Sequence, residues 1–213
     1  MSTNTQQQLN TSNASSAVQA SLEIRAASGL LGLCWALGVP GNLVVLAVLQ
    51  PRLAGGRFTL WLMLNLAVSD LLTLLTLPVW IHTLLHGWSL GAVPCKLLSC
   101  LEYWSLYTSM LCVTLLSVQR YLQVLHPQRW AELKSTGRRI LLGLVWALGG
   151  VMSSHALVQR EVRAGMDGLL HCLPRYRWAG EQVATLLMES LLLFVLPFSI
   201  MASLYCTSPC TEG

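Results

Sequence analysis

Long apolar stretches separated by short polar ones are the dominant pattern along this chain. Three stretches hold no charged residue, at 26–51, 140–159 and 190–211. Two more, 58–95 and 97–119, hold a single carboxylate each, Asp70 and Glu102. A helix that rises about 1.5 Å per residue needs roughly 20 apolar residues to cross the hydrocarbon core of a bilayer. The pattern therefore predicts five membrane-spanning helices, at about 26–50, 58–85, 95–124, 139–159 and 182–206.

The composition also favours an all-α bundle of transmembrane helices. Of the 213 residues, 54% are hydrophobic and only 10% are charged, whereas soluble domains carry about 25% charged residues. The net charge of +4 is too small and too dispersed to favour a nucleic-acid partner. The sequence contains no glycine-rich phosphate loop, no Cys/His metal spacing and no Ser/His/Asp set that geometry could unite. We therefore expect neither an enzyme nor a metal centre.

The polar N-terminus bears on the orientation in the membrane. Residues 1–23 form a polar stretch in which positions 1–22 contain no lysine or arginine, and we expect a disordered extracellular tail there. Asn10 and Asn13 each begin a glycosylation sequon, which favours an outside N-terminus. The Lys and Arg counts on the two sides are nearly equal, so the positive-inside rule decides little. We expect a multi-pass plasma-membrane protein whose residues 207–213 form a short cytoplasmic tail.

Two cysteines fall where a disulfide is chemically reasonable. Cys95 opens the third predicted helix, and Cys172 lies in the loop between the fourth and fifth predicted helices, on the same side of the membrane. If that side is extracellular, the oxidising compartment allows the two thiols to pair. The alternative is that both remain free thiols.

Asp70 stands 12 residues from Phe58, near the middle of the second predicted helix. A carboxylate at mid-bilayer is costly unless it is paired, hydrated or protonated, so it is a functional hypothesis by default. Asn42 and Ser109 fall at comparable depth on the first and third helices. The three side chains could form a polar cluster that holds a sodium ion. The alternative is a neutral, hydrogen-bonded carboxylic acid that only ties helices together.

Eight short motifs, in consistent order, resemble the rhodopsin-like G-protein-coupled receptors. They are "GN" at 41–42, "LNLAVSDLL" with Pro78, Cys95, "SVQRY" at 117–121, Trp146, Cys172, and "FVLPF" with Pro197 and Tyr205. The resemblance covers about residues 26–206, which corresponds to five of the seven helices of that family. It implies that a heterotrimeric G protein could bind only if the missing helices were supplied.

The resemblance gives Arg120 a role beyond that of an arginine marking a helix end at the membrane surface. In the family, an acid precedes this arginine and holds it in the resting state, and a tyrosine on the fifth helix meets it on activation. Here Arg120 and Tyr121 match the motif, Tyr205 matches the fifth-helix tyrosine, and Gln119 replaces the acid. A neutral amide can accept a hydrogen bond from Arg120 but supplies no charge, so we expect a loosened inactive latch.

Within the family, the outer half resembles the leukotriene B4 receptor group through "SLYTS", "HCLPRY" and "MESLLLFVLPF". This resemblance implies a long lipid ligand with a carboxylate and hydroxyl groups, bound by Arg160 and Glu189. Ser99 stands where that group usually has a histidine. Glu102 has no counterpart and would oppose an anionic ligand unless Arg160 or Lys96 compensates.

Other polar and aromatic residues are assigned structural roles. We expect a solvated inner face at Lys134, Arg138 and Arg139, and packing roles for His155 and Trp104.

Three functional interpretations remain open on sequence alone. The first is a truncated receptor that does not signal by itself. The second is a regulatory partner that forms an oligomer with full-length receptors. The third is a fragment of a transporter or channel that uses Asp70 and Glu102 as an ion path, although the sequence shows no inverted repeat.

Overall fold

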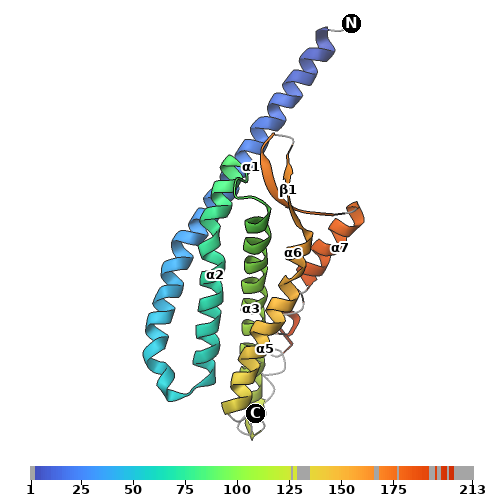
Figure 1. The fold of residues 1–213 in the computed structure, drawn as a ribbon. Coiled ribbons are helices and arrows are strands. Elements are labelled where there is room, and N and C mark those ends of the chain that lie inside the picture. The colour runs from blue at the N-terminus through green and yellow to red at the C-terminus, as the bar shows by residue number, and fades with distance from the viewer. Residues whose placement is uncertain are drawn as a thin grey trace.

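A computed structural model shows an elongated bundle of helices with a small β-hairpin near one end (Figure 1). The structure describes residues 3–125, 127–128, 135–165, 168–176, 178–191, 195, 198–200 and 202–203, with no side chains described for 3–17, 135, 179 and 186. The elements are α1 (Thr3–Leu49), the 3-10 helix η1 (Gln50–Gly55), α2 (Phe58–His86), α3 (Ala92–Leu125), α5 (Ser135–Ser153), α6 (His155–Gln159), β1 (Arg160–Ala164), β2 (Leu170–Pro174) and α7 (Ala179–Ser190).

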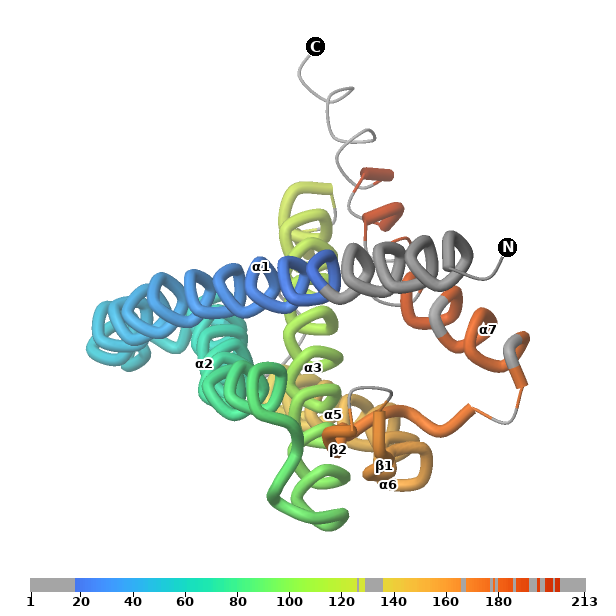
Figure 2. Tube along the Cα trace, turned by 90° about the horizontal axis from the view of Figure 1, so that it is seen from above, coloured from blue at the N-terminus to red at the C-terminus, as the bar shows by residue number. Residues whose placement is uncertain are grey.

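The helices pack in chain order, α1 against α2, α2 against α3, and α3 against α5 and α6. Seen from above, α3 lies between α2 and α5, which places it at the centre of the bundle (Figure 2). Three helical stretches in the described part of the chain are long and apolar enough to cross a membrane, at 18–55, 58–86 and 136–159. The central helix α3 is 34 residues long but more polar, as expected for a helix that faces neighbouring helices on several sides.

The N-terminal segment, for which the sequence predicts a disordered tail, is part of helix α1 in the structure. Helix α1 begins at Thr3 and runs without interruption through the polar stretch into the apolar one. The sequence contains no glycine or proline between Thr3 and Ser28, so nothing in it breaks the i to i−4 hydrogen-bond ladder. The glycosylation sequons at Asn10 and Asn13 lie in this helix, and their side chains fall outside the described residues.

The fourth and fifth predicted helices differ in detail from the structure. The fourth is divided at Ser154 into α5 and α6. The fifth begins at Ala179 in α7, and the predicted cytoplasmic tail at 207–213 lies outside the described residues. Between α6 and α7 the chain forms the antiparallel hairpin β1–β2, with Val162 opposite Cys172. Hydropathy does not reveal this hairpin because its ten residues are too short and too mixed in polarity.

Small residues let α5 approach α3 closely. A Cβ atom added to Gly149 would lie 2.6 Å from the Thr108 hydroxyl, and Gly150 lies against the ring of Trp104. The Trp104 indole donates a hydrogen bond to the Trp146 carbonyl at 2.8 Å. The Trp146 indole in turn donates to the amide oxygen of Asn65 on α2 at 2.8 Å. These contacts fix the side of α3 that faces α5, which agrees with the packing role expected for Trp104.

Candidate functional site

One end of α3 is held to the hairpin by the predicted disulfide. Cys95 and Cys172 are bonded in the structure, and both are buried, at 0% and 9% exposure, beside Trp88. The Trp88 amide donates to the Leu170 carbonyl at 2.6 Å. Gly87, which ends α2 with φ +80°, lies so close to this strand that a Cβ atom would be 3.1 Å from the Leu170 carbonyl oxygen. Covalent and hydrogen bonds thus tie the hairpin over the ends of α2 and α3.

Near this end, a cavity of about 410 Å³, here called the α7 pocket, lies between α3, α5, α6 and α7. Its lining consists of Tyr107, Met152, His155, Gln159, Glu181, Ala184, Thr185, Met188 and Glu189. The lining combines aromatic and aliphatic side chains with a few hydrogen-bond acceptors and donors, as sites for small organic ligands do. Of the four predicted ligand-binding residues, Glu189 belongs to this lining.

Arg160 lies beside the α7 pocket, at the junction of α6 and β1. Its guanidinium donates a hydrogen bond to the Tyr103 hydroxyl at 3.3 Å and lies 5.7 Å from the centre of the Tyr103 ring. It also interacts electrostatically with the carboxylate of Glu102. The structure therefore supplies a counter-charge for Glu102, the acid that the sequence analysis could not reconcile with an anionic ligand.

Glu189 faces the same cluster from α7. Its carboxylate lies 3.9 Å from the His155 ring nitrogen and interacts with the Tyr103 hydroxyl. The His155 ring contacts Tyr103 edge-on, with 4.9 Å between ring centres. The cluster thus joins a cation, an acid, an imidazole and a phenol from four elements.

Sequence reasoning missed Tyr103, Tyr107 and His155 as members of this site. The two tyrosines stand one helical turn apart on α3, and their rings are 6.1 Å apart. Their i, i+4 spacing puts them on one face of the helix, the same face as Ser99 one turn earlier. That spacing was the sequence feature from which the two tyrosines could have been predicted to share a site. His155 was assigned to packing because nothing in the sequence places it opposite Glu189.

Ser99 does not lie in the α7 pocket. It is fully buried, and its hydroxyl is 3.9 Å from the Cys172 sulfur. Ser99 packs against the bonded cysteines, and its ligand-binding role stays a prediction.

The mid-helix polar cluster forms in part. Ser109 donates a hydrogen bond to the Asp70 carboxylate at 2.7 Å and exchanges another with Ser69 at 2.8 Å. Asn42 and Asp70 both line a cavity of about 460 Å³ between α1 and α2, but the Asn42 amide donates to the Gly38 carbonyl at 3.0 Å. Within the described residues no group of three or more His, Cys, Asp or Glu side chains could hold a metal ion. A sodium ion near Asp70 stays a prediction, to be tested with Asp70→Asn.

The other end of α3 departs from the expected latch. The Gln119 side chain is buried, at 1% exposure, and its amide nitrogen donates to the Thr59 hydroxyl on α2 at 2.5 Å. Its amide oxygen has no hydrogen-bond partner among the described residues, so it does not accept a bond from Arg120. Arg120 is exposed. Successive helical positions point about 100° apart, which separates the two side chains. Tyr121 lies half-buried beside them, and Tyr205 falls outside the described residues.

Comparison with known proteins bears on this arrangement. The chain is 34% identical over 179 residues to leukotriene B4 receptor 1 of Homo sapiens, which covers 83% of this chain and 51% of the receptor. It is 35% identical to C5a anaphylatoxin chemotactic receptor 1 of Danio rerio, with 79% and 49% covered. It is 33% identical to C-C chemokine receptor type 8 of Mus musculus, with 79% and 48% covered. The chain spans about half the length of the curated relatives it matches.

The family assignment rests on a match to a family model. Residues 41–211 match the family model described as 7 transmembrane receptor (rhodopsin family). That range includes the disulfide, the Asp70–Ser109 contact, the α7 pocket and the end of α3 that carries Arg120. It also covers α2, α5 and α6, which pack against α3. The chain is a multi-pass membrane protein that belongs to the rhodopsin family of seven-transmembrane receptors.

Proposed function

We propose that this chain carries the ligand pocket of a receptor for a hydroxylated fatty-acid mediator of the leukotriene B4 type. The ligand carboxylate would bind Arg160, and its hydroxyl groups would donate to Glu189. The hydrocarbon chain would lie along Met152 and Met188. The proposal places the disulfide end and the N-terminus outside the plasma membrane.

The observation that carries the proposal is the position of Arg160. Its guanidinium, held against the Tyr103 hydroxyl and balanced by Glu102, lies beside the apolar pocket that Glu189 lines. Arginine in such a place recognises a carboxylate through charge-assisted hydrogen bonds. A relative at 34% identity is itself named as a leukotriene B4 receptor.

Coupling to a heterotrimeric G protein belongs to the same proposal. Arg120 is exposed at the opposite end of α3 from the disulfide, where a cytoplasmic partner could contact it. The Gln119–Thr59 bond is neutral and leaves Arg120 without the acid that the family usually supplies. We therefore expect any G-protein activation by this chain to be raised in the absence of ligand. Replacing Gln119 with aspartate should lower that basal activation, because the acid can pair with Arg120.

Saturation binding of tritiated leukotriene B4 to membranes that express the full chain tests the ligand. We expect Arg160→Gln to abolish specific binding. Arg163→Gln is the matched control, because Arg163 lies on the same strand but pairs with Glu161. This variant should bind leukotriene B4 with unchanged affinity. Equal affinity in both variants would contradict the proposal.

A second candidate is a receptor for a basic peptide. Glu181 and Glu189 both line the α7 pocket, and two acids favour a cationic group. Two other relatives are named as receptors for a C5a anaphylatoxin and for C-C chemokines. Displacement of the radioligand by a Lys/Arg-rich peptide would favour this candidate over the lipid if the Glu181→Gln variant no longer showed that displacement.

A further inference from the structure

Two histidines lie one helical turn apart at the end of α2. His82 and His86 are both exposed, and their rings stack with 4.7 Å between ring centres and 30° between ring planes. Residues four apart share one face of a helix, and histidines at this spacing supply the two zinc ligands of a known helical motif. Such pairs also occur on helices that bind no metal, so the spacing alone predicts no metal centre.

A hydrogen bond sets the proton position in one of the two rings. The Nδ1 atom of His86 lies 3.1 Å from the carbonyl oxygen of His82. Because a carbonyl oxygen can only accept, Nδ1 carries the proton in this contact, and Nε2 keeps its lone pair. Histidines that bind metals are usually oriented in this way, with the other ring N–H donated to a backbone carbonyl or a carboxylate. His86 therefore presents Nε2 as a metal ligand.

The separation of the two rings fits a shared metal ion. An ion about 2.0–2.1 Å from a histidine nitrogen lies roughly 3.2 Å from the centre of that ring. Ring centres 4.7 Å apart then subtend roughly 95° at the ion when both Nε2 atoms point to it. This angle lies between those of square-planar and tetrahedral coordination, which are typical of Cu²⁺ and Zn²⁺. Both rings are exposed, so water can complete the coordination.

The end of α2 is also a favourable place for a cation. The helix ends at His86, and the carbonyl groups of a last turn carry the negative end of the helix dipole. The sequence has no lysine or arginine between Arg57 and Lys96 that would repel a cation from this helix. The 29 residues of α2 span about 43 Å, which exceeds the roughly 30 Å of the hydrocarbon core. Its last turn can therefore lie at the membrane surface, in contact with water.

We infer that His82 and His86 bind a divalent transition-metal ion, and that Cu²⁺ binds more tightly than Zn²⁺. No third His, Cys, Asp or Glu among the described residues joins the pair. The site is therefore an exchangeable one, unlike a structural zinc centre with four protein ligands. An ion held by two residues one turn apart would fix the last turn of α2, next to Trp88, whose amide bonds the hairpin.

Zinc titration of the purified full chain in detergent tests this inference. Every sample carries Cys34→Ser, because the exposed thiol of Cys34 is another zinc ligand. Calorimetry should show one equivalent of bound Zn²⁺, and His86→Gln should weaken the binding at least about tenfold. The matched control is the exchange His82→Leu/Leu85→His, at a leucine that is 46% exposed. It keeps both histidines but at adjacent positions, which do not face each other, and should bind as weakly as His86→Gln.

Two further measurements separate a metal site from a change of fold. The electron paramagnetic resonance spectrum of bound Cu²⁺ should show two coordinating nitrogens in the parent chain and one in His86→Gln. Zinc should raise the thermal midpoint of the parent chain but of neither variant, while the midpoints without zinc stay equal. Absence of zinc binding, equal zinc affinity in either variant, or an unchanged Cu²⁺ spectrum in His86→Gln would each overturn the inference. None of these outcomes depends on the ligand proposed for the α7 pocket.

Discussion

The two ends of α3 are held in different ways. At one end a covalent bond joins Cys95 to Cys172 across 77 residues, among buried aromatic side chains. At the other end a neutral hydrogen bond joins Gln119 to Thr59, and the next residue, Arg120, is exposed. The difference is one of kind: the pocket end of α3 is fixed by a covalent bond, and the contact that Gln119 makes at its arginine end is a neutral hydrogen bond to α2.

The largest effect is expected at the covalent end. Cys95→Ser opens a loop of 77 residues, and loss of such a crosslink costs about 2–5 kcal/mol of unfolding free energy. The thermal midpoint of the chain in detergent should fall and become insensitive to reductant. Cys34→Ser, at an exposed free cysteine, is the control. A midpoint unchanged by Cys95→Ser would show that the two ends do not differ in this way.

The middle of α3 should be nearly as sensitive, because packing holds it. Gly149→Ala places a Cβ atom 2.6 Å from the Thr108 hydroxyl, and such overpacking costs about 1–3 kcal/mol. Gly143→Ala on the same helix meets nothing within 4 Å and should be neutral or stabilising by less than about 1 kcal/mol. Thermal unfolding of both variants gives the difference. Equal midpoints would mean that α5 does not press on α3.

A smaller effect is expected where Gln119 meets α2. Thr59→Val removes the acceptor of the buried amide and should cost about 1–2 kcal/mol. Thr59→Ser keeps the hydroxyl and should recover most of that loss. If the serine and valine variants unfold at the same temperature, the hydrogen bond contributes nothing and the arginine end of α3 is held by packing alone.

The smallest effect should come from Arg120 itself. Its side chain is exposed, and surface substitutions away from packed features change stability by no more than about 0.5 kcal/mol. Arg120→Gln should leave the unfolding midpoint unchanged while removing any binding of a G-protein C-terminal peptide. A clear drop in stability would instead give Arg120 a structural role at this end.

Hydropathy was enough to predict a bundle of apolar helices, because twenty uncharged residues in a row have few other stable environments. The disulfide also followed from position, since Cys172 is the loop cysteine on the side of Cys95. The partner of Asp70 was predictable because depth along a helix follows from residue number. In the structure Ser109 donates to that carboxylate.

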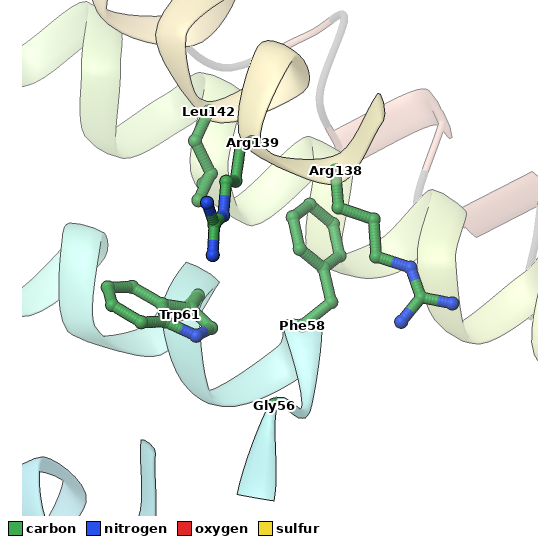
Figure 3. A pocket seen from close by; sticks show the side chains of 6 residues that line it. All are labelled: Gly56, Phe58, Trp61, Arg138, Arg139 and Leu142. Atoms are coloured by element: carbon green, nitrogen blue, oxygen red, sulfur yellow. The ribbon is translucent and has the colours of Figure 1, made fainter. Parts of the chain in front are cut away.

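Other features depend on contacts that no local pattern contains. The helical rotation of α3 decides that Gln119 faces Thr59 and not Arg120, and that Ser99 faces the sulfur of Cys172. The packing of α6 and β1 against α3 decides that Arg160 meets Tyr103. The approach of α5 to α2 decides that Arg138 is half-buried and that Arg138 and the exposed Arg139 line one cavity with Phe58 and Trp61 (Figure 3).

The sequence by itself indicated the family through its motifs. It also determined the helical class and the depth of each polar residue, because these two follow from composition and from a fixed rise per residue. Only the tertiary structure decided which side chains share a site. That choice depends on the angle at which each residue leaves its helix and on how closely the helices pack. The Arg160–Tyr103–Glu189 cluster is the clearest case, since its members come from three elements far apart in the chain.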